Sequence, residues 1–155
     1  MNICEFNGAL YRYERAGNQL KLRRLSSEEA RRIRESGREV PSCFKVLMGI
    51  DVVYEYELEK NAKRVINIHL NVTKFNKFVT DGVEITGTHR TSGRVWRGKI
   101  IDGEKFDGKC VFDIPMTLNV RNTRIYEFED KCVLVQEQSG YRQYATIIVG
   151  RKESP

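Results

Sequence analysis

Alternation of apolar and polar residues at every second position is the feature of this sequence that most restricts its fold. In the clearest stretch one set of alternate positions is apolar throughout: Phe44, Val46, Met48, Ile50, Val52, Tyr54, Tyr56 and Leu58. A period of two residues is typical of a β-strand with one buried face. We therefore expect an extended strand over 44–58, with a bend or bulge at Gly49, where a glycine in a strand pattern often marks one.

The same alternation recurs along the rest of the chain. Apolar residues again occupy every second position from Ile66 to Val72, after a polar turn at 60–63. This segment should pair with the preceding strand as an antiparallel hairpin. Further short strands are expected over 82–88, 94–101, 109–114, 117–120, 123–129, 132–138 and 144–149. Between them lie residues that favour turns, such as Asp102-Gly103 and Ser139-Gly140.

The N-terminal part has a different pattern. Two strands are expected over 3–14 and 19–25, around a turn at 16–18. Ser26 followed three residues later by Glu29 is the spacing of a capping box, in which the two residues satisfy free backbone groups at the start of a helix. Arginines follow in the next turn, and Gly37 is a suitable stop. The sequence therefore predicts one short helix near residues 27–36.

Together these segments predict a mainly β fold with a minor α component. Many short strands joined by tight turns indicate a single antiparallel β-barrel or sandwich of about 8–10 strands. Hydrophobic residues make up 40% of the 155, which is enough to form a core and excludes a disordered chain. We expect one domain over 1–155, with a strand–strand–helix part at 1–40 and an antiparallel meander at 41–150.

The apolar runs and the cysteines indicate where in the cell the protein is located and whether it holds a structural metal ion. No apolar run approaches the length of about 20 residues that a membrane helix needs, and the N-terminus lacks the basic and apolar regions of a signal peptide. Cys4, Cys43, Cys110 and Cys132 lie too far apart in sequence for a zinc knuckle. Two disulfides are possible in three connectivities, but a chain with its own core does not need them. We expect reduced thiols in a cytoplasmic or nuclear protein that is not secreted.

Positive charge is concentrated in one part of the chain. The formal net charge is +6, and residues 63–99 carry eight Lys and Arg but only two Asp and Glu. Aromatic residues are interleaved with these cations. Cations that pair with phosphates, beside aromatic rings that stack on bases, are typical of nucleic-acid binding. The predicted contact residues are Lys74, Lys77, Arg90, Arg94, Trp96, Arg97 and Lys99, with Arg23-Arg24 and the helix arginines as possible extensions of the surface.

We therefore expect a non-enzymatic binding protein for RNA or DNA, with no catalytic residues, cofactor or metal. Two Glu-x-Glu pairs, Glu55/Glu57 and Glu127/Glu129, offer an alternative. On strands they resemble the paired carboxylates of metal-dependent tunnel triphosphatases, which would imply a phosphohydrolase. Inward glutamates at 55 and 57, however, would turn the apolar row 44–58 outward. Two further alternatives are a barrel holding a small apolar ligand and a protein-interaction domain that uses strand edges or the segment 141–144.

Overall fold

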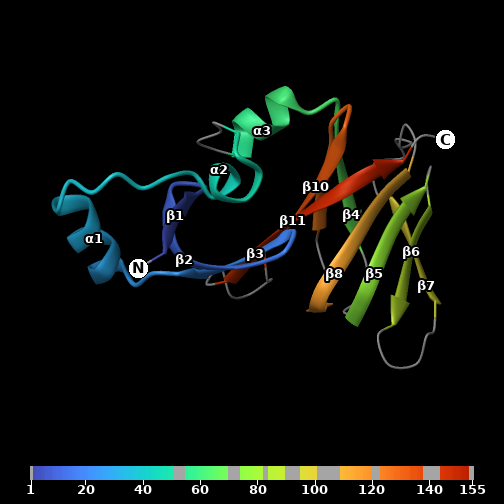
Figure 1. Ribbon diagram of the computed structural model, residues 1–155, viewed down its shortest axis with the longest axis horizontal. Coiled ribbons are helices and arrows are strands. Elements are labelled where there is room, and N and C mark those ends of the chain that lie inside the picture. The colour runs from blue at the N-terminus through green and yellow to red at the C-terminus, as the bar shows by residue number, and fades with distance from the viewer. Residues whose placement is uncertain are drawn as a thin grey trace.

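The fold was analysed in a computed structural model that describes residues 2–50, 55–69, 74–81, 84–89, 95–100, 109–119, 123–137 and 144–153. These residues form short helices and antiparallel strands (Figure 1). The helices are α1 (Ser27–Glu35), α2 (Cys43–Met48) and α3 (Glu55–Asn61). The strands are β1 (Ile3–Phe6), β2 (Ala9–Ala16), β3 (Gln19–Arg24), β4 (Arg64–His69), β5 (Lys74–Asp81), β6 (Glu84–His89), β7 (Val95–Ile100), β8 (Lys109–Asn119), β9 (Thr123–Glu127), β10 (Lys131–Glu137) and β11 (Tyr144–Glu153).

One sheet contains all of these strands, in the order β1-β2-β3-β11-β10-β9-β4-β7-β6-β5-β8. Strand β8 also pairs with β11, from Arg151↔Val111 to Glu153↔Lys109, so the pairings of β4 to β11 lead back to their starting strand. We call these eight strands the ring. The prediction of a mainly antiparallel β fold is confirmed. The ring does not follow chain order throughout, because β4 lies between β7 and β9.

A disulfide between Cys110 on β8 and Cys132 on β10 identifies the concave side of the ring. Strand β11 lies between these two strands. In a flat sheet, strands two apart are separated by about 10 Å, whereas the two Cα atoms here are 6.2 Å apart. The sheet must therefore curl around the face that carries these cysteines. The bond also corrects the expectation of reduced thiols, because Cys4 and Cys43 form a second disulfide.

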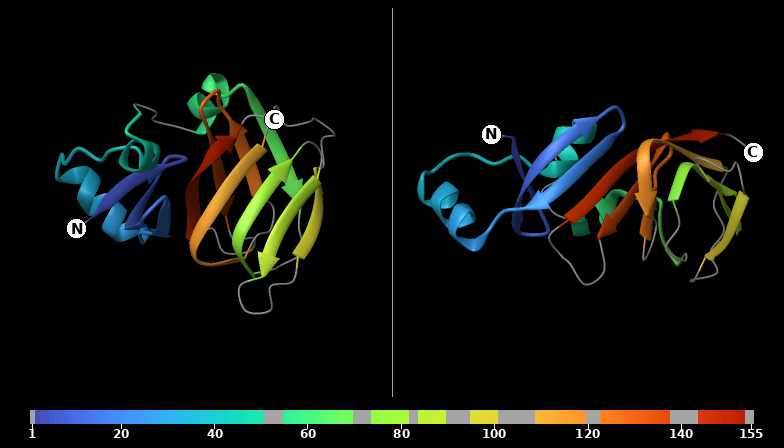
Figure 2. Two further views of the ribbon diagram at one scale, coloured as in Figure 1. Left: turned by 45° about the vertical axis from the view of Figure 1, so that its right-hand side comes forward. Right: turned by 90° about the horizontal axis from the view of Figure 1, so that it is seen from below.

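Strands β1, β2 and β3 extend the sheet from β11 and carry α1 and α2 with them (Figure 2). Phe6 on β1 and Phe44 on α2 pack edge to face in a core that also contains Leu20 and Ile147. The Cys4–Cys43 disulfide joins β1 to α2 within this core. Helix α1 covers the opposite face, over a smaller apolar cluster of Ile3, Leu10, Leu25 and Ala30.

Helix α1 begins where the sequence predicts. Ser26 is its N-cap, and the Ser26 hydroxyl accepts a hydrogen bond from the Glu29 backbone N–H at 3.2 Å. The same hydroxyl also lies 3.2 Å from a carboxylate oxygen of Glu29. Because this pair of residues satisfies a free group at the first turn, the start of the helix can be read from local sequence alone.

The predicted strand over 44–58 is wrong. Residues 43–48 and 55–61 form α2 and α3, while residues 51–54 lie outside the described residues. Ser42 caps α2 by accepting a hydrogen bond from the Phe44 N–H, and Gly49 ends it with a left-handed φ of 75°. Apolar residues are so dense in this stretch that they satisfy the helical spacing of Cys43, Phe44 and Leu47 as well as the period of two. The two caps decide in favour of the helix.

The strands differ from the prediction in three further places. The expected strand over 3–14 is a hairpin, because Asn7 and Gly8 adopt φ values of 50° and 79° and form the tight turn that Asn-Gly favours. Strand β5 was not predicted. The expected strands over 109–114 and 117–120 form the single strand β8, in which Pro115 lies where the pairing with β5 shifts register between Phe75 and Lys77.

Gly150 permits the close approach of β11 to β8. A Cβ atom added at this position would lie 2.6 Å from the buried ring of Phe112 and 2.9 Å from the carbonyl oxygen of Val111. We expect Gly150→Ala to lower the free energy of unfolding by about 2 kcal/mol, because the core has no space for the added methyl group. Urea denaturation measures this loss. Adding Phe112→Leu should recover part of it, whereas a Gly150→Ala protein as stable as the wild type would contradict the packing.

Candidate functional site

The structure places most of the residues predicted to bind nucleic acid on neighbouring strands. Lys74 and Lys77 lie on β5, and Trp96, Arg97 and Lys99 lie on β7. Both strands pair with β6, so these five residues share one three-stranded part of the ring. The other two predicted residues, Arg90 and Arg94, lie outside the described residues.

The N-terminal arginines do not extend that part of the ring. In Figure 1 and in both views of Figure 2, β5, β6 and β7 lie at the opposite end of the molecule from α1. Arg23 and Arg24, at the end of β3, lie close to the start of α1. The basic segments of the sequence therefore form two separate regions.

Two arginines and a tyrosine lie side by side across β2, β3 and β11. Arg12 on β2 is the register partner of Arg23 on β3, and Arg23 is the register partner of Tyr144 on β11. Register partners on neighbouring strands point to the same face of a sheet, so we call these three residues the arginine row. All three are exposed, and Tyr144 keeps 42% of its surface accessible. The sequence analysis missed Arg12 and Tyr144 as members, because only the strand register brings them together.

The charges of the arginine row are poorly balanced. Like charges directly opposite each other on paired strands are destabilising, and Arg12 faces Arg23 in this way. Arg12 lies 3.4 Å from a carboxylate oxygen of Glu29, in an ion pair whose side chains are both about half exposed. Neither the Arg23 nor the Arg24 side chain forms a hydrogen bond or ion pair with another residue in the described part of the chain.

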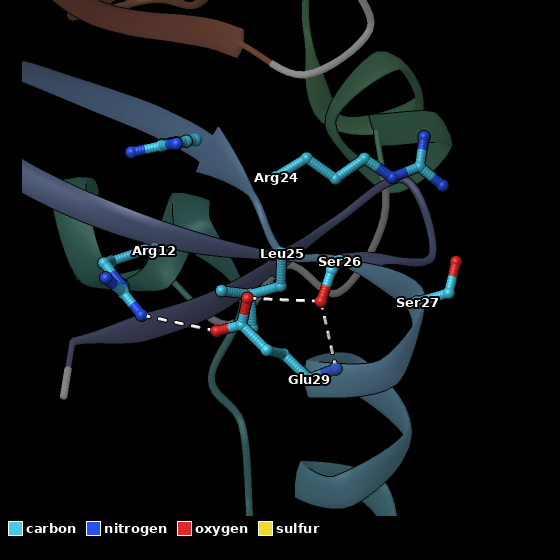
Figure 3. Close-up of a pocket in the computed structure, with 7 residues that line it drawn as sticks. Arg12, Arg24, Leu25, Ser26, Ser27 and Glu29 are labelled. Atoms are coloured by element: carbon cyan, nitrogen blue, oxygen red, sulfur yellow. Dashed lines mark hydrogen bonds and ion pairs between the residues drawn. The ribbon is translucent and has the colours of Figure 1, made fainter.

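A pocket of about 490 Å³ adjoins the arginine row (Figure 3). It lies where β3 leads into α1. Its lining residues are Arg12, Arg23, Arg24, Leu25, Ser26, Ser27 and Glu29. In Figure 3 the ion pair of Arg12 and Glu29 lies on one side and Arg24 extends away from it. This is expected because Arg24 follows Arg23 on β3, and successive residues of a strand point to opposite faces. The three arginines outnumber the single glutamate, so the pocket favours anions.

The glutamate pairs do not form the paired carboxylates of a tunnel. Glu55 and Glu57 lie on helix α3, where residues two apart point in different directions. Glu127 ends β9 and is fully buried, whereas the Glu129 side chain is 85% exposed. The prediction that both pairs lie on strands is therefore wrong.

Glu55 instead belongs to a polar cluster that attaches α3 to β9. It accepts hydrogen bonds from the Tyr126 hydroxyl and from the side-chain amide of Asn7, the latter at 2.7 Å. Arg124 lies 3.4 Å from Glu55 and 2.5 Å from Glu59. Burial and the hydrogen bond to Glu55 raise the pKa of Tyr126 far above its ordinary value. Because these groups satisfy one another, we assign the cluster a structural role.

Glu127 and Lys152 form a second internal contact, at one end of the ring. The ammonium nitrogen of Lys152 lies 2.9 Å from a carboxylate oxygen of Glu127, and the two side chains are 10% and 0% exposed. Lys152 also donates a hydrogen bond of 3.1 Å to the carbonyl oxygen of Phe128. A buried ion pair with further hydrogen bonds is a structural element of the ring wall.

Within the described ranges no three or more His, Cys, Asp and Glu side chains are grouped so as to hold a metal ion. The helices that the structure describes are too short and too polar to cross a membrane. No protein-family model matches the chain, and neither a curated protein nor a solved structure matches it.

Proposed function

We propose that the protein is a non-enzymatic binding protein that holds single-stranded nucleic acid, RNA or DNA, on the arginine row. The observation that carries this proposal is the exposed set of Arg12, Arg23 and Tyr144 on neighbouring strands. Within the described residues the Arg23 guanidinium group has no hydrogen-bond or ion-pair partner. A guanidinium group binds a phosphate through two parallel hydrogen bonds. Two phosphates of one strand would neutralise the repulsion between the opposed arginines.

The tyrosine favours nucleic acid over other polyanions. An exposed aromatic ring beside cations on a sheet surface is a common platform for unpaired bases, because every base has a face that can stack. Tyr144 meets this description, since it is exposed and neighbours Arg23 across the strand pair. Base pairs in a duplex are already stacked on one another, so the platform favours a single strand. Arg24, which lines the adjoining pocket, would add positive charge beside the row.

Replacing both arginines of the row by glutamine tests the proposal. We expect Arg12→Gln with Arg23→Gln to lower the affinity for a single-stranded 12-mer by about tenfold or more at 100 mM salt, because two phosphate contacts are lost. The slope of log affinity against log salt should also fall by about 1.4. Fluorescence anisotropy measures both quantities.

A matched control is available on α1. Arg31→Gln with Arg32→Gln removes the same charge, but these arginines pair with Glu35 and Glu28 within the helix. We expect this variant to bind within about threefold of the wild type, since only its long-range charge is changed. Equal losses in both variants would show that net charge alone attracts the ligand, and the arginine row would not be the site.

The same binding experiment tests the predicted segment 63–99 as an alternative site. Arg94→Glu with Arg97→Glu should leave affinity unchanged if the strand binds only at the arginine row. Loss of affinity in this variant alone would assign binding to the segment 63–99. A protein-interaction domain remains the second candidate, with Tyr144 in its contact surface. Salt separates the two, because phosphate contacts weaken steeply with added salt and an apolar protein interface does not.

The cytoplasmic or nuclear location stays a prediction. It depends on cysteines that were expected to be reduced, whereas all four described cysteines are in disulfides. Disulfides persist mainly in oxidising compartments. The location should therefore be tested separately from nucleic-acid binding.

A further inference from the structure

The face of the sheet that carries the arginine row continues inward as a polar surface. Two residues along each strand, Lys21 on β3 pairs with Thr146 on β11, and Thr146 pairs with Gln136 on β10. Gln136 in turn pairs with Thr123 on β9. Lys21 and Thr146 are half-buried, whereas Gln136 and Thr123 are buried. We call these four residues the polar row.

Beyond the polar row, Gln19 presents an unsatisfied amide. Its side chain is fully buried, and neither its oxygen nor its nitrogen has a hydrogen-bond partner among the described residues. Gln19 precedes Lys21 by two residues and Arg23 by four, so all three point to the same face of β3. At about 3.3 Å per residue, the Cα atoms of Gln19 and Arg23 are about 13 Å apart.

An unpaired amide in the interior is unfavourable, and such groups in native proteins call for a specific explanation. The neighbouring apolar residues provide none, because the register partner of Gln19 on β11 is the buried Ile148. Along β3 this face carries first exposed cations, then half-buried polar groups, and finally the buried donor and acceptor of Gln19. A ligand with phosphates at one end and a hydrogen-bonding base at the other would match these groups in that order.

We propose that Gln19 reads one base of the bound strand and that this base is adenine. This inference rests on the proposed function, because the arginine row must hold the phosphates of the same strand. A glutamine amide offers a donor and an acceptor side by side, and adenine offers the complementary N7 acceptor and N6 donor. Lys21 and Thr146, which lie between the Arg23–Tyr144 pair and the Gln19–Ile148 pair, would line the path of the base from Tyr144 to Gln19.

Entry of the base requires a movement, because Gln19 is closed off from solvent in this structure. Side chains that cover the amide must be displaced before the base can reach it. Binding that requires a conformational change has a lowered association rate. We therefore expect oligo(A) to associate more slowly than oligo(U), although oligo(A) binds more tightly at equilibrium.

The test compares single-stranded 12-mers of A, U and C by fluorescence anisotropy and stopped-flow mixing. The wild type should prefer oligo(A) by about tenfold, which is within the range for one bidentate contact to a base. In Gln19→Leu the preference should fall below twofold, while the affinity for oligo(U) and its salt dependence stay unchanged. Because an unpaired polar group is removed, the Tm should rise by about 3 °C.

Thr123→Val is the matched control. Its hydroxyl is also buried and has no partner within the described ranges, but strands β11 and β10 separate β9 from β3. This variant should raise the Tm in the same way and keep the preference for oligo(A). Gln19→Met replaces the leucine variant if that protein does not fold.

The results distinguish failure of the proposed nucleic-acid binding from failure of the assignment of Gln19 as the base-reading residue. Failure of the wild type to bind any of the three oligonucleotides would overturn the proposed function itself. Binding without a preference for oligo(A), or a preference that survives the substitution of Gln19, would overturn only the assignment of Gln19. A preference lost in the Gln19 variant and kept in the Thr123 variant is the result that we expect.

Discussion

Replacing Lys152 by methionine is expected to lower the free energy of unfolding by about 3–5 kcal/mol. The substitution keeps most of the apolar length of the side chain and removes only its charge. The carboxylate of Glu127, which is fully buried, would then lose the ammonium group that lies 2.9 Å away. Removing one partner of a buried ion pair is strongly destabilising, because the remaining charge stays in a medium of low dielectric constant. Urea denaturation of the oxidised protein measures the loss.

Two further variants separate the ion pair from simple packing. Lys152→Arg keeps the charge and should lose less than Lys152→Met. Adding Glu127→Leu to Lys152→Met should recover a large part of the stability, because a pair of apolar residues carries no penalty for a buried charge. If Lys152→Met cost less than 1 kcal/mol, the contact with Glu127 would not contribute to the ring wall as we describe.

Removal of the Cys4–Cys43 disulfide is expected to have an effect of similar size. The two cysteines are 39 residues apart, and closing a loop of this length restricts the unfolded chain by about 4 kcal/mol in the chain-entropy model. Cys4→Ala with Cys43→Ala should therefore unfold at a much lower urea concentration than the wild type. Both residues are fully buried in the core where β1 meets α2, so alanine is the substitution that adds no polar group.

The disulfides themselves can be counted directly. A maleimide reagent added to the unfolded, unreduced protein should label no cysteine, and it should label four after reduction. Labelling of Cys110 and Cys132 without reduction would contradict the curl of the ring across β11 that their bond identifies. Labelling of all four would restore the sequence-based expectation of reduced thiols.

Local signals predicted the parts of the fold that depend on neighbouring residues. Helix α1 was found because Ser26 and Glu29 form its cap within a single turn. Strand β3 was found because turn residues precede it at 16–18 and the cap of α1 follows it at Ser26. Helix α2 was missed because its apolar residues fit two periods, and the caps at Ser42 and Gly49 carried the deciding information.

The candidate site depends on pairing between strands that are far apart in the sequence, so these local signals could not predict it. Arg23 and Tyr144 are register partners although more than a hundred residues separate them in the chain. Nothing in either segment specifies the other, because register is set by the packing of the whole sheet. Charge along the sequence pointed instead to 63–99, where cations are close in the chain. In three dimensions β5, β6 and β7 lie at the opposite end of the molecule from α1 (Figure 1), whereas Arg23 lies close to the start of that helix.

The most direct test of binding at the arginine row is a titration of the wild-type protein with a single-stranded 12-mer at several salt concentrations. Two phosphate contacts, one each for Arg12 and Arg23, predict a slope near −1.4 in log affinity against log salt. The affinity should then fall about sevenfold between 50 and 200 mM salt. Binding that is absent at 50 mM salt, or that does not change over this range, would contradict the proposal that the protein holds nucleic acid through these arginines.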